Sequence, residues 1–282
     1  MDVVTIIQLC ENSELILVTI PVKSDTGVFN RDYQEVRTIL KVISVLKGDP
    51  KIKAISNFHS PFISCPPPPN YPIGDTILTF IVKEPSGNRY ITYAEAYGTK
   101  RLTGKHYYGC IEKINDLLTI MNKSDDDLEN PLIVEWLVKT LKNPILKWDC
   151  ARLLRFGDYE YNDYQFVIRH YGELLSEKQR LEIYDFILDR NEIDISELWL
   201  IEIVDDLNDY RLLPLLLEYL DKHTKYHLTM ATDVMTWICE IKGGKAGLKL
   251  IEEYKKEIKK IPADRDILEV IRRFKILMQS QD

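Results

Sequence analysis

The sequence lacks long apolar runs and paired cysteines. No hydrophobic stretch approaches the roughly 18 to 20 residues that cross a bilayer. Met1-Asp2-Val3 opens without the basic region and apolar stretch of a secretory signal. We therefore expect a soluble protein with no membrane partner, cytoplasmic unless the native gene carries an upstream signal. The odd number of cysteines and the absence of a Cys-x-x-Cys pair argue against a disulfide framework; they are Cys10, Cys65, Cys110, Cys150 and Cys239.

Motifs for catalysis and phosphate binding are missing as well. The glycine-rich segment Lys242 to Gly247 lacks the preceding strand and the Ser or Thr of a nucleotide-binding loop, so we interpret it as a turn between helices. There is no nucleophile elbow and no serine-centred triad. We therefore predict that the protein is not an enzyme and takes no cofactor and no small-molecule substrate.

Metal-ligand spacing occurs only at His223 and His227, which would share one helix face. No glutamate follows the first histidine as in zinc proteases, so we predict no metal site there. The acidic runs Asp125 to Glu129 and Asp205-Asp206 are interpreted as solvated helix ends, because negative charge is favourable at a helix N-terminus and ordinary on an exposed face.

Net positive charge is also lacking, and its distribution divides the chain. The whole sequence has 37 basic and 44 acidic residues, a net charge of −7, which repels a phosphate backbone unless cations gather locally. Residues 1–105 hold 12 basic and 10 acidic residues (12 − 10 = +2), and the remainder holds 25 and 34 (25 − 34 = −9). Nine of the 13 prolines also fall in the first part. We predict two domains, 1–105 and 107–282.

The first part has the alternating apolar pattern of half-buried strands. Lys47-Gly48-Asp49-Pro50 and Glu84-Pro85-Ser86-Gly87-Asn88 supply turns between them. The expected strands are 15–22, 35–46, 51–57, 76–83 and 89–93. Short strands without intervening helices predict a small antiparallel barrel or sandwich. We expect its core to consist of Leu15, Leu17, Ile39, Val42, Ile52, Ile77, Phe80 and Ile91.

From Tyr107 onward the apolar period changes to 3.6, which predicts helices. One stripe runs from Ile111 to Met121, and a second from Leu132 to Leu141 is opened by Asn130 as cap and Pro131 in the first turn. Further helices are expected near 144–156, 163–171, 176–190, 195–206, 209–222, 225–242, 245–260 and 264–279.

Two of these helical stretches resemble each other. Residues 130–157 and 209–243 each form a helical pair with a proline near the start and a small residue, Ala151 or Ala231, in the second helix. This pattern resembles HEAT-like repeats, in which each pair buries its apolar face by stacking on its neighbours. An irregular helical bundle is the alternative. The predicted fold class is therefore α+β, with an N-terminal barrel and a C-terminal helical array.

The barrel region resembles the netrin-like, or tissue-inhibitor-of-metalloproteinases-like, domain, a five-stranded barrel of the oligonucleotide/oligosaccharide-binding type. The matching segments are 12–23 (NSELILVTIPVK), 36–49 (VRTILKVISVLKGD, with its Val-x-Lys-Gly-Asp ending), Cys65 with 73–80 (IGDTILTF), and 97–102 (YGTKRL). Together these segments cover about a third of the chain.

The departures from this family matter for function. Its protease inhibitors chelate zinc through a free N-terminal cysteine, whereas Cys10 of this chain is internal. Glu95-Ala96-Tyr97 occupies the place of the cysteine that often pairs with the loop cysteine. The resemblance thus implies the fold and not the inhibitory activity. We expect five free thiols, with a bridge between Cys65 and Cys110 as the alternative.

One basic and aromatic patch follows the barrel. It contains Lys100, Arg101, Lys105, Tyr107 and Tyr108. Such a patch suits single-stranded nucleic acid, which stacks on aromatics and pairs with cations, but the same cations could instead face the acidic helical part. We therefore predict a scaffold or adaptor that binds a polypeptide, with these five residues as anchors, because Tyr and Arg are enriched at hot spots. Single-stranded nucleic-acid binding and a degenerate metalloprotease inhibitor are the alternatives.

Overall fold

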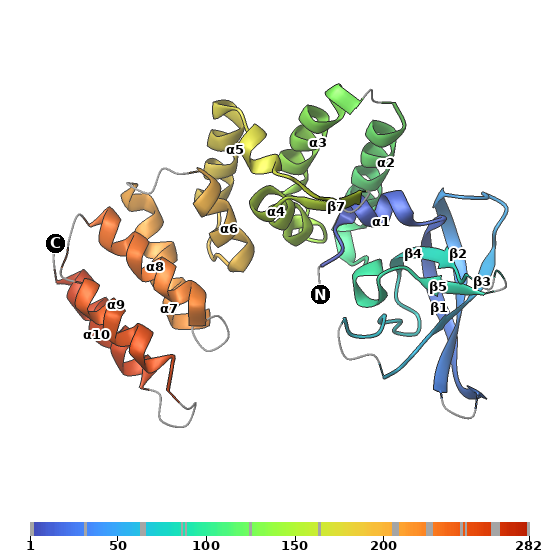
Figure 1. Cartoon of the computed structure of the whole chain (residues 1–282), viewed down its shortest axis with the longest axis horizontal. Helices are drawn as coiled ribbons and strands as arrows, with labels where there is room; N and C mark the ends of the chain where they lie inside the picture. The colour runs from blue at the N-terminus through green and yellow to red at the C-terminus, as the bar shows by residue number, and fades with distance from the viewer. Residues whose placement is uncertain are drawn as a thin grey trace. The chain divides into compact units, whose positions relative to one another are not determined.

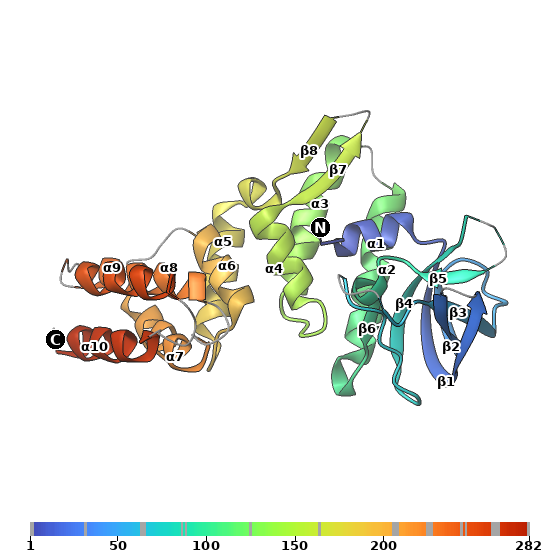
Figure 2. The same ribbon diagram turned by 60° about the horizontal axis from the view of Figure 1, so that its bottom comes forward.

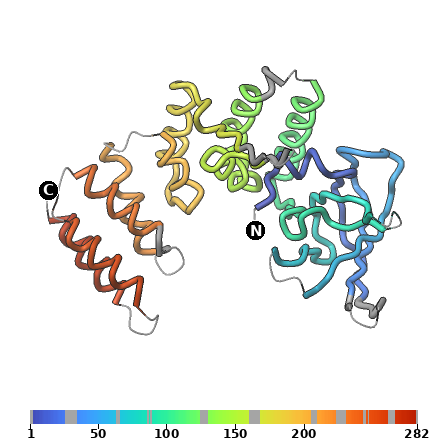
Figure 3. The backbone as a smooth tube through the Cα atoms, viewed as in Figure 1, coloured from blue at the N-terminus to red at the C-terminus, as the bar shows by residue number. Residues whose placement is uncertain are grey.

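The computed structural model describes residues 3–30, 33–62, 66–85, 87, 89–123, 126–162, 165–204, 209–223, 228–242, 245, 247–260 and 266–280, and Figure 3 draws them in colour. The chain forms two compact units, Met1–Leu174 and Leu175–Asp282. None of the helices in the described ranges combines the length and apolar character that a bilayer crossing requires.

The first unit contains a closed five-stranded barrel. Its strands follow the order β1-β2-β3-β5-β4, and pairing between β1 and β4 closes the ring. All ring pairs are antiparallel except β3 with β5. The strands are β1 (Leu15–Asn30), β2 (Tyr33–Lys47), β3 (Ala54–His59), β4 (Ile77–Lys83), β5 (Tyr90–Thr92) and β6 (Thr99–Arg101), the last paired with β4 (Figure 1). The predicted fold class, a barrel followed by helices, is confirmed.

The barrel interior differs from the predicted core at three positions, Ile39, Phe80 and Ile91. Thr38, Leu40 and Val42 of β2 point inward because side chains alternate along a strand. Ile39 therefore faces outward, and Leu40 takes its place in the core. In β4 the same alternation places Ile77 and Ile81 inside and Phe80 on the opposite face. The predicted core residues Leu15, Leu17, Val42 and Ile77 are confirmed, with Ile52 packed beside them; Ile91 is only half-buried, in the outward row of Arg37 and Phe58.

The outer face of β1 and β4 is buried too. Ile16 pairs with Phe80 and Val18 with Leu78, and all four side chains are inaccessible to solvent. Helix α1 (Ile6–Asn12) packs against β4 (Figure 1). The sequence prediction missed α1, although the capping-box pattern of Thr5 and Gln8 indicates a helix start there.

Helices and a hairpin complete the first unit. They are η1 (Glu95–Gly98), η2 (Gly104–His106), α2 (Tyr107–Lys123), α3 (Asp126–Thr140), α4 (Lys147–Phe156), β7 (Asp158–Asn162), β8 (Gln165–Arg169) and η3 (Tyr171–Leu174). The helix predicted over 163–171 is wrong, because residues 165–169 pair with β7 in a sheet separate from the barrel (Figure 2). Aromatic and β-branched residues favour strands over such short lengths. The predicted start at Asn130 is also wrong, since α3 begins at Asp126 and contains Pro131.

The second unit is helical. Its elements are α5 (Glu177–Leu188), α6 (Ile195–Val204), η4 (Tyr210–Leu212), α7 (Leu213–His223), α8 (Leu228–Ile241), α9 (Leu248–Glu257) and α10 (Ile267–Gln279). Successive helices pack together: α5 on α6, α7 on α8, α8 on α9, and α9 on α10. The two stretches that resemble each other in sequence thus form the packed pairs α3–α4 and α7–α8.

The position in the sequence where strands give way to helices differs from the boundary between the two compact units. Strands give way to helices at η2 and α2, close to the composition change near residue 106. The compact units meet instead between Leu174 and Leu175. Residues 107–174 therefore pack with the barrel, and the domain limits 1–105 and 107–282 stay a prediction about independent folding.

Candidate functional site

Lys100 of the predicted patch is not a surface cation. It lies on β6, and its Nζ donates to both carboxylate oxygens of Asp149 on α4, at 2.7 and 2.9 Å. The side chains are only 15% and 4% exposed. A buried charge needs such a partner, because desolvation is otherwise costly. Lys100 thus joins the barrel to the helical segment, as the interpretation that barrel cations face acidic helices predicts.

Arg101 and Lys105 remain on the surface. The Nε of Arg101 lies 2.7 Å from Oδ2 of Asp75, and the guanidinium stays largely exposed. Lys105 lies exposed in η2. Of the three cations in the patch, one is therefore internal and one is paired with an acid. This reduces the charge that the segment offers to a phosphate backbone.

Tyr107 and Tyr108 come together at the start of α2. Their rings meet edge to face, with centroids 4.8 Å apart and planes at 88°. Burial and the neighbouring Tyr108 raise the pKa of Tyr107. The Tyr108 side chain is 79% exposed, a large value for an aromatic residue. Tyr107 thus contacts a ring that otherwise projects into solvent, where a recognition anchor would lie.

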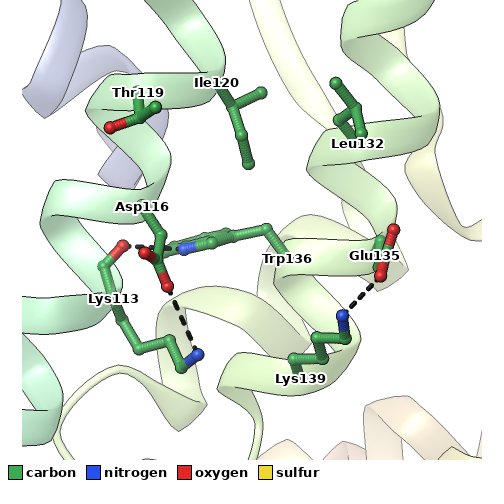
Figure 4. Close-up of a pocket in the computed structure, with 8 residues that line it drawn as sticks. All are labelled: Lys113, Asp116, Thr119, Ile120, Leu132, Glu135, Trp136 and Lys139. Atoms are coloured by element: carbon green, nitrogen blue, oxygen red, sulfur yellow. Dashed lines mark hydrogen bonds and ion pairs between the residues drawn. The ribbon is translucent and has the colours of Figure 1, made fainter.

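The exposed face of α2 leads from Tyr108 to a groove. Asn115 and Thr119 lie seven and eleven residues after Tyr108, which places all three on one side of the helix. Thr119 lines a cavity of about 330 Å³ between α2 and α3. The lining residues are Lys113, Asp116, Thr119, Ile120, Leu132, Glu135, Trp136 and Lys139 (Figure 4).

The groove has an apolar end and a charged end. Trp136 reaches from α3 toward α2 (Figure 4), and its indole N–H donates to the carbonyl oxygen of Lys113 at 2.7 Å. Ile120 and Leu132 lie at the end away from the lysines. The opposite end carries the ion pairs Lys113–Asp116 and Lys139–Glu135. Four of the eight lining residues are charged, whereas small-molecule pockets are mostly apolar. This composition suits a side chain of a polypeptide better.

The sequence prediction missed this groove. Leu132 and Trp136 belong to the predicted apolar stripe, but Leu132 is exposed while Ile133 and Leu137 are buried. Trp136 is also buried, at 4% exposed, so Leu132 is the residue of this stripe that reaches the surface. The i,i+3 and i,i+4 charge pairs of the groove were the available signal.

The remaining predicted residues fall elsewhere. Cys10, Cys110, Cys150 and Cys239 are buried free thiols, which overturns the alternative bridge between Cys65 and Cys110; Cys65 itself lies outside the described residues. Burial raises the pKa of Cys10 and Cys150, and raises that of Cys110 to about 12. His227, Asp125 and Asp205-Asp206 also lie outside the described residues, as does the His223 side chain. Within the described part of the chain, no cluster of His, Cys, Asp or Glu fits a metal ion.

The residues behind the netrin-like resemblance have structural roles. Nζ of Lys47 donates to the carbonyl oxygens of Cys10 and Glu11, at 2.8 and 2.9 Å, and so caps the C-terminus of α1. Gly48 has φ of +111°, and a Cβ there would lie 2.4 Å from Leu15. A Cβ on Gly98 would lie 2.0 Å from the carbonyl oxygen of Tyr93. These motifs specify the barrel and its attached helix.

The fold and the candidate site define an α+β protein with a closed barrel, an attached helical array and an exposed tyrosine beside a groove. No protein-family model matches this chain, and no curated protein matches it either.

Proposed function

We propose that this protein is a non-enzymatic scaffold or adaptor that binds a polypeptide through α2, α3 and the Tyr108 ring. The exposed ring of Tyr108, in edge-to-face contact with Tyr107, is the observation that carries the proposal. A large aromatic ring has few rotatable bonds, so it loses little entropy on binding and contributes much buried area.

The groove specifies the kind of polypeptide. An apolar side chain would fit between Ile120 and the exposed Leu132, and charged neighbours would meet the ion pairs at the other end. An amphipathic helix offers both kinds of side chain on adjacent turns. The partner we propose is therefore an amphipathic helical segment whose apolar face covers α2 and α3.

The thiols support the non-enzymatic part of the proposal. The thiolate is the nucleophilic form of cysteine, and burial keeps the pKa of Cys10, Cys110 and Cys150 above the ordinary range. Cys10 also lies inside α1, where its carbonyl oxygen accepts from Lys47. A zinc-chelating terminal cysteine needs a free amino group and a free carbonyl, so this position is unsuited to metalloprotease inhibition.

Family membership and location belong to the same proposal. The roles of Lys47, Gly48 and Gly98 support a netrin-like barrel. The packed pairs α3–α4 and α7–α8 support a HEAT-like array. Buried free thiols are compatible with the reducing cytoplasm, where we propose that the protein acts.

The test is affinity capture from the native lysate, followed by reconstitution with the purified partner. Tyr108→Ala and Leu132→Glu should each weaken binding at least ten-fold, with circular dichroism and the urea midpoint showing that the fold is kept. Arg101→Ala should weaken it less, because the pair with Asp75 is exposed. Tyr210→Ala is the matched control, since Tyr210 is an exposed tyrosine of the second unit.

Two results would reject the proposal. One is a reconstituted complex whose affinity is unchanged by Tyr108→Ala and Leu132→Glu. The other is the absence of any captured protein, together with binding of single-stranded nucleic acid at physiological salt with a Kd below about 1 µM, which is tighter than ordinary non-specific association.

A further inference from the structure

We infer that the outer face of strands β1 and β2 is a second docking surface, for an acidic polypeptide segment bearing aliphatic side chains. This barrel face is defined by Ile20, Lys23, Arg37, Ile39, Lys41 and Ile43. It belongs to elements other than α2 and α3, so the inference does not rest on the function proposed for Tyr108.

Strand register places these residues on one surface. Ile20 pairs with Lys41, and Lys23 pairs with Ile39. The alternate residues Leu40 and Val42 point into the barrel, so Ile39 and Lys41 point out. Ile43 is the extra residue at a register shift opposite Val18 and Thr19, and its exposure places it on the same outer surface. A register shift between Pro21 and Lys23 marks a bulge that exposes Val22 beside them.

The barrel face exposes aliphatic side chains where a solvated strand face is normally polar. Ile43 is 46% exposed, and Ile20 and Ile39 are half-buried. The corresponding outward residues at the other end of β1, Ile16 and Val18, are fully buried beneath the rest of the first unit. The outer apolar face of β1 at Ile16 and Val18 is thus covered by the same chain, whereas the neighbouring apolar side chains of the barrel face stay exposed and are available to a partner.

The charges around these aliphatic residues favour an acidic occupant. Lys23, Arg37 and Lys41 are exposed cations of the barrel face. Among the described residues in the cross-strand pairs Ile20–Lys41, Lys23–Ile39 and Asp25–Arg37, the one acid is Asp25. Lys23 forms an ion pair with Asp25. Arg37 donates to the hydroxyl of Ser56 at 3.0 and 3.2 Å, a neutral partner. The barrel face is therefore locally basic on a protein whose net charge is −7.

A polypeptide fits this chemistry better than a nucleic acid. Bases bind single-strand platforms by stacking on exposed aromatic rings. The aromatic residue paired with Arg37 on β3 is Phe58, which is half-buried and has the Arg89 guanidinium 5.0 Å from its ring centroid. Aliphatic side chains flanked by lysines suit alternating acidic and aliphatic residues, whose charges would meet Lys41 and Arg37.

The experiment selects ligands from a displayed library of random twelve-residue peptides against the full chain. Enriched peptides should carry Asp or Glu together with Val, Ile or Leu. Ile43→Ser and Lys41→Glu should each weaken the selected peptide at least ten-fold in fluorescence anisotropy. Leu248→Ser and Lys249→Glu are matched controls, since Leu248 is also 46% exposed and Lys249 is an exposed lysine. Tyr108→Ala should leave this binding unchanged, which separates it from the function proposed for α2 and α3.

Other outcomes would overturn the inference. These are the failure to enrich any peptide, or enriched peptides that bind Ile43→Ser and Lys41→Glu as tightly as the parent chain. Oligo(dT) binding below about 1 µM that Lys41→Glu abolishes would assign the barrel face to nucleic acid instead. Binding to phosphatidylserine vesicles that Lys41→Glu abolishes would assign the barrel face to a membrane surface.

Discussion

At the scale of single residues, the buried thiols lower the stability of the folded protein at alkaline pH. Cys10, Cys110 and Cys150 are held neutral because burial raises the pKa of each above its ordinary value of 9.0. The unfolded chain has ordinary thiols, which ionise first as the pH rises. The unfolded state then binds fewer protons than the folded state, so stability decreases with pH.

We predict that Cys110→Ala reduces this alkaline loss. Stability from the raised pKa is fully present below about pH 9 and is lost as the pH rises toward the folded pKa of about 12. Each pH unit in this window costs about 1.4 kcal/mol per thiol. Urea midpoints at pH 7.5 and pH 10.5 should therefore differ less for Cys110→Ala than for the parent chain. Equal differences would show that the Cys110 thiol also ionises in the folded state.

At the scale of elements, β6 and α4 are joined by the Lys100–Asp149 pair. In the sequence, Lys100 belongs to a run of cations beside tyrosines, which could equally bind a partner or face the acidic helical part. The structure places its side chain against a carboxylate 49 residues later. Nothing local in the sequence distinguishes Lys100 from Arg101; only the packing of α4 does.

We predict that Lys100→Met destabilises the protein by about 3 kcal/mol, because it leaves the Asp149 carboxylate buried without its partner. Asp149→Leu should cost a similar amount for the converse reason. The double variant Lys100→Met with Asp149→Leu should lose clearly less than the sum, in urea unfolding. Additive losses would mean that the two charges do not depend on each other.

Other elements show what the sequence can and cannot predict. Strands β1 and β2 and most helices follow from apolar periodicity and turn residues. Ile39 and Phe80 were assigned to the wrong face, because a one-residue change in phase reverses a strand while leaving its composition unchanged. The helix expected over 163–171 lies where β8 forms, since short aromatic stretches fit either period. The α2–α3 groove depends on Leu132 lying outside the buried face of α3, which only the packing of α2 decides.

At the scale of the whole molecule, the packing places the domain boundary at a different residue from the composition. The outer barrel residues Ile16, Val18, Leu78 and Phe80 are inaccessible to solvent. Their burial, and the partner of Lys100, depend on elements that extend to Leu174 in the same compact unit. A barrel cut at residue 105 would keep its interior but lose α4 and the hairpin β7–β8.

We predict that a fragment of residues 1–174 folds with a cooperative urea transition, whereas a fragment of residues 1–105 aggregates or unfolds without cooperativity. The physical reason is the apolar and charged surface that the shorter fragment exposes. Circular dichroism and size-exclusion chromatography of the two fragments test this. A monomeric, cooperatively folded 1–105 fragment would restore the domain limit inferred from composition.

The contacts of α1 bear on how the protein is made. Thr5 Oγ1 donates to the Asp158 carboxylate at 2.9 Å, and the Gln8 side chain donates to the carbonyl oxygen of Tyr159, so the first helix is anchored to residues about 150 positions later. During synthesis, the N-terminal strands leave the ribosome long before that anchor exists. Distant pairings of this kind fold slowly. A nascent chain carrying only the barrel would present its outer apolar strands to solvent for seconds, which is the circumstance in which chaperones engage an emerging polypeptide.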